Sequence, residues 1–104
     1  MRKGEVWWAD LPGPVGKRPV VILTRDAVLP SIDGLVVAVV TRTIRNLPTE
    51  VVLGRRQGLP GRCVVSLDNL LTVPRHRLTR LMGACDLEKL AELNRAIKAA
   101  FDLD

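Results

Sequence analysis

Short runs of β-branched and apolar residues, each closed by turn-forming residues, recur through the first 85 residues of this 104-residue chain. They predict six strands, over residues 5–11, 19–24, 35–43, 50–53, 63–73 and 78–84. Segments such as Pro12-Gly13-Pro14 and Gly58-Leu59-Pro60-Gly61 separate the runs, because Pro fixes φ and Gly frees it. Short strands at this spacing favour a small barrel or a curled sheet.

The hydrophobic pattern changes at Asp86, which is placed to cap a helix. From there to residue 103, apolar residues recur at steps of three and four, as on one stripe of an amphipathic helix: Leu87, Leu90, Leu93, Ile97 and Phe101. The end of the barrel or a second copy of the chain would cover this stripe. We therefore expect one domain over residues 1–104, strand-rich over 1–85 and helical over 86–103.

The positive charge of the chain lies in the strand-rich part. Residues 1–85 carry 13 Lys+Arg and 6 Asp+Glu, a sum of +7, whereas residues 86–104 carry 3 and 5, a sum of −2. Eight arginines lie between Arg42 and Arg80 against only Glu50 and Asp68. Arginine suits two-pronged contact with phosphate, so the surplus points either to a polyanionic partner or simply to a solvated surface.

No apolar run approaches the ~20 residues that cross a bilayer, and no signal-peptide pattern opens the chain. We expect a cytoplasmic protein with no membrane partner, in which Cys63 and Cys85 are buried reduced thiols.

The residues exclude most catalytic chemistries. The lone His76 and two distant cysteines form no familiar metal-ligand pair, so we assign no metal, and no P-loop or dinucleotide-binding turn indicates a cofactor. What remains is arginine and hydroxyl chemistry: Arg18 begins one apolar strand and Thr41 ends another. Adjacent strand ends can bring such groups to one phosphate, although each also suits an ordinary strand terminus.

Several segments, in order and spacing, resemble the MazF/PemK family of toxin ribonucleases. They are Arg2-Lys3-Gly4-Glu5-Val6-Trp7-Trp8-Ala9-Asp10-Leu11, Gly16-Lys17-Arg18-Pro19-Val20-Val21-Ile22-Leu23, Val39-Val40-Thr41-Arg42-Thr43, Leu47-Pro48-Thr49-Glu50-Val51, Ser66-Leu67-Asp68-Asn69 and Arg75-His76-Arg77-Leu78. The resemblance implies a small SH3-like, MazF-like β-barrel with a closing C-terminal helix. It also implies a homodimer with an RNA groove at the subunit interface.

By this resemblance Arg18 and Thr41 are the catalytic residues of a metal-independent, sequence-specific endoribonuclease. The 2′-hydroxyl of single-stranded RNA would attack the adjacent phosphorus, leaving a 2′,3′-cyclic phosphate and a 5′-hydroxyl. Trp8 suits either base stacking or the core. Leu71 stands where many relatives have arginine, which leaves Arg42, Arg45, Arg75 and Arg77 as alternative phosphate contacts. The predicted RNA-binding residues are Trp8, Asp10, Lys17, Arg42, Asp68, Asn69 and Arg75.

The resemblance further implies a cognate antitoxin, similar to MazE, whose acidic tail lies over the groove. Two alternatives remain: a gyrase poison resembling CcdB, which shares the fold without nuclease activity, and a catalytically silent module that binds RNA or antitoxin.

Overall fold

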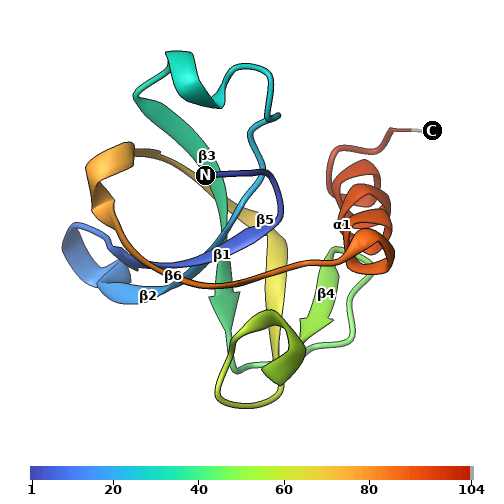
Figure 1. The fold of residues 1–104 in the computed structure, drawn as a ribbon. Helices are drawn as coiled ribbons and strands as arrows, with labels where there is room; N and C mark the ends of the chain where they lie inside the picture. Colours follow the sequence, from blue (N-terminus) through green and yellow to red (C-terminus); the bar gives the residue numbers. More distant parts are fainter. Residues whose placement is uncertain (104) are drawn as a thin grey trace.

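The computed structural model describes residues 1–103, which form one antiparallel sheet of six strands and a C-terminal helix (Figure 1). Along the sheet the strands follow the order β4-β5-β3-β2-β1-β6. Their bounds are β1 Glu5–Asp10, β2 Lys17–Ile22, β3 Gly34–Thr41, β4 Glu50–Leu53, β5 Cys63–Pro74 and β6 Leu78–Ala84, and the helix α1 is Leu87–Ala100. All six predicted strands are present, with bounds within two residues of those expected.

The sheet curls into a half-barrel, which confirms the predicted mainly β fold with a closing helix. Its central strands are buried on both faces. Val20 and Ile22 pack inside the curl with Val37, whereas Val21 packs toward the helix with Ala38. This two-sided burial is why β2 and β3 are continuous apolar runs rather than alternating ones.

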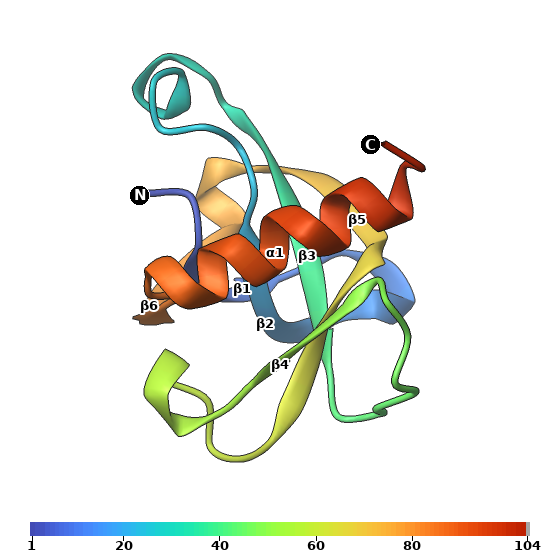
Figure 2. The ribbon, with the colours of Figure 1, turned by 90° about the vertical axis from the view of Figure 1, so that its right-hand side faces the viewer.

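Helix α1 packs against β4 and β5 and closes one open side of the curl (Figure 2). Asp86 caps it, as predicted, by accepting a hydrogen bond of 2.9 Å from the backbone N–H of Lys89. Leu93 and Ala96 are the buried residues of the helix. In the part of the chain that the structure describes, no helix is long and apolar enough to span a bilayer.

The predicted apolar stripe is wrong at its two ends. Leu87 is 86% exposed and Phe101 is 56% exposed, so neither packs on the sheet. The helix also stops at Ala100, before the predicted residue 103, because Asp102 takes a left-handed conformation with φ 55°. The backbone N–H of Leu103 then turns back to the carbonyl of Lys98, a C-terminal capping geometry.

The two edges of the curled sheet are joined by a close backbone approach. The 3₁₀ turn Arg55–Gln57, which follows β4, lies against β6. A Cβ atom on Gly83 would overlap the carbonyl oxygen of Gln57, and one on Gly58 would overlap that of Met82. Glycine is needed at both positions because two backbones meet there, and Gly58 also has φ 89°.

We predict that Gly83→Ala destabilises the fold by about 2 kcal/mol, because the added methyl forces the turn away from β6. In urea, the unfolding midpoint should fall by about 1 M. Gly61→Ala is the matched control, since nothing lies within 4 Å of a Cβ there, and its midpoint should not fall. Equal midpoints for the two variants would contradict the prediction.

Candidate functional site

A pocket of about 950 Å³ lies where the contact between β6 and the 3₁₀ turn Arg55–Gln57 brings distant segments together. One wall comes from β1 and the first residues of β2, and another from the end of β3. The β4–β5 connector and β6 supply the rest. The lining residues are Trp8, Lys17, Arg18, Pro19, Val40, Thr41, Arg42, Arg55, Gly58, Leu59, Pro60, Gly61, Arg62, Cys63, Arg80 and Met82.

Among residues 1–103, the lining carries six cationic side chains and no carboxylate: Lys17, Arg18, Arg42, Arg55, Arg62 and Arg80. Within residues 1–103 the ion pairs are Met1–Glu5 and Lys89–Glu92, and neither involves the pocket. Like charges concentrated in one concave wall repel each other and create a field that favours an anion. The pocket is therefore suited to a polyanionic ligand.

The register between β2 and β3 brings Arg18 and Thr41 to this pocket. The paired segment runs from Ile22–Val37 to Val20–Val39, so Arg18 and Thr41 each lie two residues beyond the last pair, at the same end of the two strands. Both side chains are partly buried and line the pocket. The structure thus brings the two predicted catalytic residues to one place.

Arg18 is oriented by its own loop. Its Nε donates a hydrogen bond of 3.1 Å to the carbonyl oxygen of Val15, at the end of the 3₁₀ turn Gly13–Val15. This contact uses one of the five guanidinium donors, and in the described structure the terminal nitrogens donate to no other protein group. They remain available for an anion in the pocket.

The hydroxyl oxygen of Thr41 accepts a hydrogen bond from the residues that follow β3. The backbone N–H of Thr43 donates to Thr41 Oγ1 at 3.2 Å. A hydroxyl has one hydrogen to donate and two lone pairs, so this contact leaves the hydrogen free. An anionic oxygen in the pocket is a suitable acceptor for it.

Cys63 contributes a protonated thiol to the wall. Burial raises the pKa of its thiol, and the positive charge of Arg42 offsets part of that rise. Its Sγ contacts the carbonyl oxygen of Leu53 at 3.8 Å. Cys85, under the helix, has its pKa raised to about 11 by burial. Both cysteines are free and buried, so the predicted reduced thiols are confirmed.

Three of the predicted RNA-binding residues, Asp10, Asp68 and Asn69, are not part of the pocket lining. Asp10 ends β1 and pairs with Lys17 across the strands. Asp68 and Asn69 are exposed in β5, where a register shift against β3 leaves residues 67–69 unpaired. Asp68 accepts a hydrogen bond of 2.6 Å from the Thr49 hydroxyl and so helps to fix the segment before β4.

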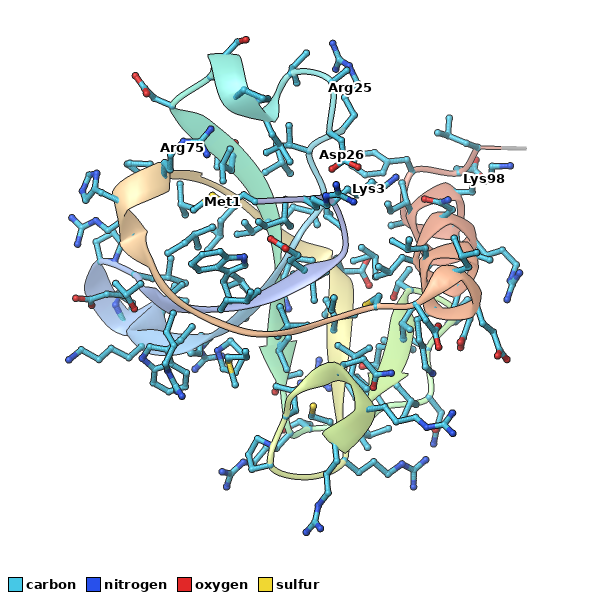
Figure 3. The ribbon with its side chains drawn as sticks, viewed as in Figure 1. Met1, Lys3, Arg25, Asp26, Arg75 and Lys98 are labelled. Carbon is cyan, nitrogen blue, oxygen red and sulfur yellow. The ribbon has the colours of Figure 1, made fainter. Side chains whose placement is uncertain are left out.

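Arg75 lies away from the pocket and makes structural contacts. Its guanidinium donates to the carbonyl oxygens of Leu29 and Ile32, the second at 2.9 Å, and lies 3.3 Å from the sulfur of Met1. Figure 3 shows it beside the loop that precedes β3. These contacts join the 3₁₀ turn after β5 to that loop, and they occupy donors that a phosphate contact would need.

Three pocket arginines were absent from the predicted site: Arg55, Arg62 and Arg80. The only sequence signal for them was the surplus of arginine between residues 42 and 80. Arg55 and Arg62 flank the β4–β5 connector, and Arg80 lies on β6. They meet only because the sheet curls, so their spacing along the chain does not reveal the site.

Comparisons with known proteins agree with this fold. Residues 2–101 match the family described as PemK-like, MazF-like toxin of type II toxin–antitoxin systems. A Mycobacterium tuberculosis protein named probable endoribonuclease MazF2 is 46% identical over 89 residues, covering 81% of this chain and 85% of the relative. Another from that organism, named probable endoribonuclease MazF5, is 37% identical and covers 96% and 92% of the two chains.

Solved structures give the same result. The Mycobacterium tuberculosis toxin MazF-mt6 superimposes with a TM-score of 0.89 at 40% identity, over 96% of this chain and 98% of that one. A mycobacterial endoribonuclease in complex with its cognate antitoxin also has a TM-score of 0.89, at 27% identity, over 100% of this chain and 97% of that one. With a family match over nearly its whole length and relatives above 30% identity, this chain belongs to the PemK-like, MazF-like toxins of type II toxin–antitoxin systems.

Proposed function

We propose that this protein is a toxin endoribonuclease that cleaves single-stranded RNA without a metal ion, at sequence-specific sites. The observation that carries the proposal is the pocket that Arg18 and Thr41 line together with five other cations and, within residues 1–103, no carboxylate. The relatives named endoribonucleases support the substrate class.

The reaction we propose exchanges one ester bond for another. The 2′-hydroxyl oxygen of the RNA bonds to the adjacent phosphorus, and the bond from phosphorus to the 5′-oxygen breaks. The 2′-oxygen loses its proton and the leaving 5′-oxygen gains one, giving a 2′,3′-cyclic phosphate and a 5′-hydroxyl. The attacking oxygen belongs to the substrate, so the protein supplies positioning and charge stabilisation rather than a nucleophile.

Arg18 would stabilise the extra negative charge on the phosphorane. Its Nε is fixed on Val15, so the terminal nitrogens are held in place before the charge develops. The hydroxyl hydrogen of Thr41, which its bond with Thr43 leaves free, would donate to a phosphate oxygen. Arginine keeps its proton at neutral pH, so Arg18 would act as a charge stabiliser and a donor rather than as a base.

The donor set of the pocket supports metal independence. Divalent ions that assist phosphoryl chemistry prefer carboxylate and carbonyl oxygens, whereas this lining presents arginine and lysine. Within residues 1–103 no group of three or more His, Cys, Asp or Glu side chains comes together. The cations of the pocket would neutralise phosphate in place of a metal ion.

We further propose that the protein works as a homodimer and is inhibited by a cognate antitoxin with an acidic segment. A relative of this fold has been solved in complex with its cognate antitoxin. The same positive field that draws RNA phosphates would draw carboxylates of such a segment. Antitoxin and substrate would then compete for one surface.

We predict that Arg18→Ala lowers RNA cleavage by at least about 100-fold, because one preorganised charge donor to the transition state is lost. The assay uses a long mixed-sequence transcript with EDTA present, cut-site mapping, and analysis of the new ends for cyclic phosphate and 5′-hydroxyl. Thr41→Val, which removes only the hydroxyl, should give a loss of similar order.

Arg25→Ala is the matched control, since Arg25 is exposed on the loop after β2 (Figure 3), whereas Arg18 lies near the start of that strand. It should cleave at the normal rate. Normal cleavage by a folded Arg18→Ala protein would remove Arg18 from the mechanism. Intact RNA with a trapped topoisomerase–DNA complex would indicate a gyrase poison, and RNA binding with no product would indicate a silent module.

Binding of non-cleavable single-stranded RNA should weaken steeply with salt. If three to six pocket cations contact phosphates, the slope of log K against log salt should be about −2 to −4, at ~0.7 per contact. Arg42→Ala should make the slope less steep by about 0.7, because Arg42 is exposed at the pocket wall. A slope near zero in the normal protein would exclude a phosphate-binding pocket.

A further inference from the structure

Arg80 lies over the ring of Trp8 at the mouth of the pocket. The guanidinium carbon is 5.8 Å from the centroid of the indole, within the range of a cation–π contact. Trp8 is partly buried and Arg80 is exposed. The pair therefore combines one fixed aromatic plane with one mobile cationic plane, both facing the pocket.

Irregular strand pairing sets this arrangement. Trp8 pairs directly with Arg80 across β1 and β6, and the register shifts on either side, between Val6 and Trp7 and between Trp8 and Ala9. The second shift leaves Thr79 without a partner in the ladder, and its hydroxyl donates to the carbonyl oxygen of Trp8 at 3.3 Å. Such bulges re-aim side chains and are frequent beside functional sites.

The guanidinium of Arg80 has no other engagement in the structure of residues 1–103. No carboxylate lies within ion-pair distance, and its nitrogens donate no hydrogen bond to the protein. The pocket arginine Arg18 differs, because a backbone carbonyl holds its Nε. Arg80 is thus free to change its position while Arg18 is fixed.

We propose that Trp8 and Arg80 form a clamp for one unpaired nucleobase of the bound RNA. The inference rests on the proposed function, because it assigns a role in RNA recognition to the same pocket. A base stacked on both planes needs about 7 Å between them, two contacts of about 3.5 Å. The guanidinium carbon lies 5.8 Å from the ring centroid, so Arg80 would swing outward to admit a base, which an exposed side chain can do.

The clamp lies next to the proposed reacting centre. Pro19, the other cross-strand neighbour of Trp8, directly follows Arg18 in β2 and also lines the pocket. Because Trp8 and Arg18 line one pocket, a base held on Trp8 would belong to the same bound strand whose phosphate contacts Arg18. Holding that base would fix the RNA backbone relative to Arg18 and Thr41.

A base clamp and a simple phosphate contact predict different behaviour for Arg80. A clamp needs the guanidinium plane, so Arg80→Lys would not preserve it. Only RNA that carries bases would then bind with lower affinity. A phosphate contact needs charge alone. Lysine would then suffice, and RNA with or without bases would lose the same affinity.

The test measures affinity for two short 2′-O-methylated RNAs with the same number of phosphates, one of mixed sequence and one with every base removed. Neither can be cleaved, so binding is read without the reaction. Quenching of Trp8 fluorescence reports stacking in a Trp7→Phe background. We expect the normal protein to prefer the base-carrying strand by at least about 10-fold.

Arg80→Ala and Arg80→Lys should each reduce this preference about 5-fold or more and weaken the quenching. Arg25→Ala should retain the preference. Equal loss of affinity for both strands, recovery of the preference by Arg80→Lys, or no effect of Arg80→Ala would each overturn the clamp. Because no outcome depends on cleavage, a protein that fails to cut RNA would refute the proposed function while the clamp is judged separately.

Discussion

The close approach of Gln57-Gly58 and Met82-Gly83 is the constraint on which the rest of the molecule depends. A six-stranded antiparallel sheet left open would expose its inner apolar face. Curling allows β2 and β3 to be buried on both faces, and the edges of the curl must then meet. At Gly58 and Gly83 they meet backbone to backbone, because a side chain at either glycine would separate them. The pocket is a consequence, since the β4–β5 connector and β6 form its wall only where the edges join.

Repulsion between the positive charges of the pocket destabilises the folded state. Six cations share one concave wall with no carboxylate among them, and their mutual repulsion opposes the closure that brings them together. The apolar cluster that contains Leu53, Leu59 and Cys63, with Met82 packed against it, supplies the opposing stabilisation, because burial of those side chains requires the same closure. An anionic ligand relieves the repulsion when it binds. Binding of a polyanion should therefore stabilise the folded state beyond the contacts of any single arginine.

The sequence predicted the parts of this molecule that depend on local pattern. Strand positions followed from β-branched runs and turn residues, and Asp86 marked the start of the helix. The placement of Arg18 and Thr41 in one pocket was also predicted, through adjacent strand ends and the family resemblance. Arg55, Arg62 and Arg80 could not be predicted, because the curl alone brings them together. Arg75 shows that the sequence pattern can also mislead. It lies beside other basic residues in the chain, but in the structure it donates hydrogen bonds to backbone carbonyls.

Arg18 and Arg80 show how one residue type serves different tasks within one pocket. Arg18 is half-buried and tied to Val15, so its position is set before a ligand arrives, as stabilisation of a transition state requires. Arg80 is exposed and, among residues 1–103, its guanidinium has the face of Trp8 as its one polar or cation–π partner, so it can adjust to a ligand of variable shape. In the proposed complex the fixed cation would serve the reacting phosphate, and the exposed one would serve a base. This division follows from backbone geometry, since a 3₁₀ turn precedes Arg18 and a bulge precedes Arg80.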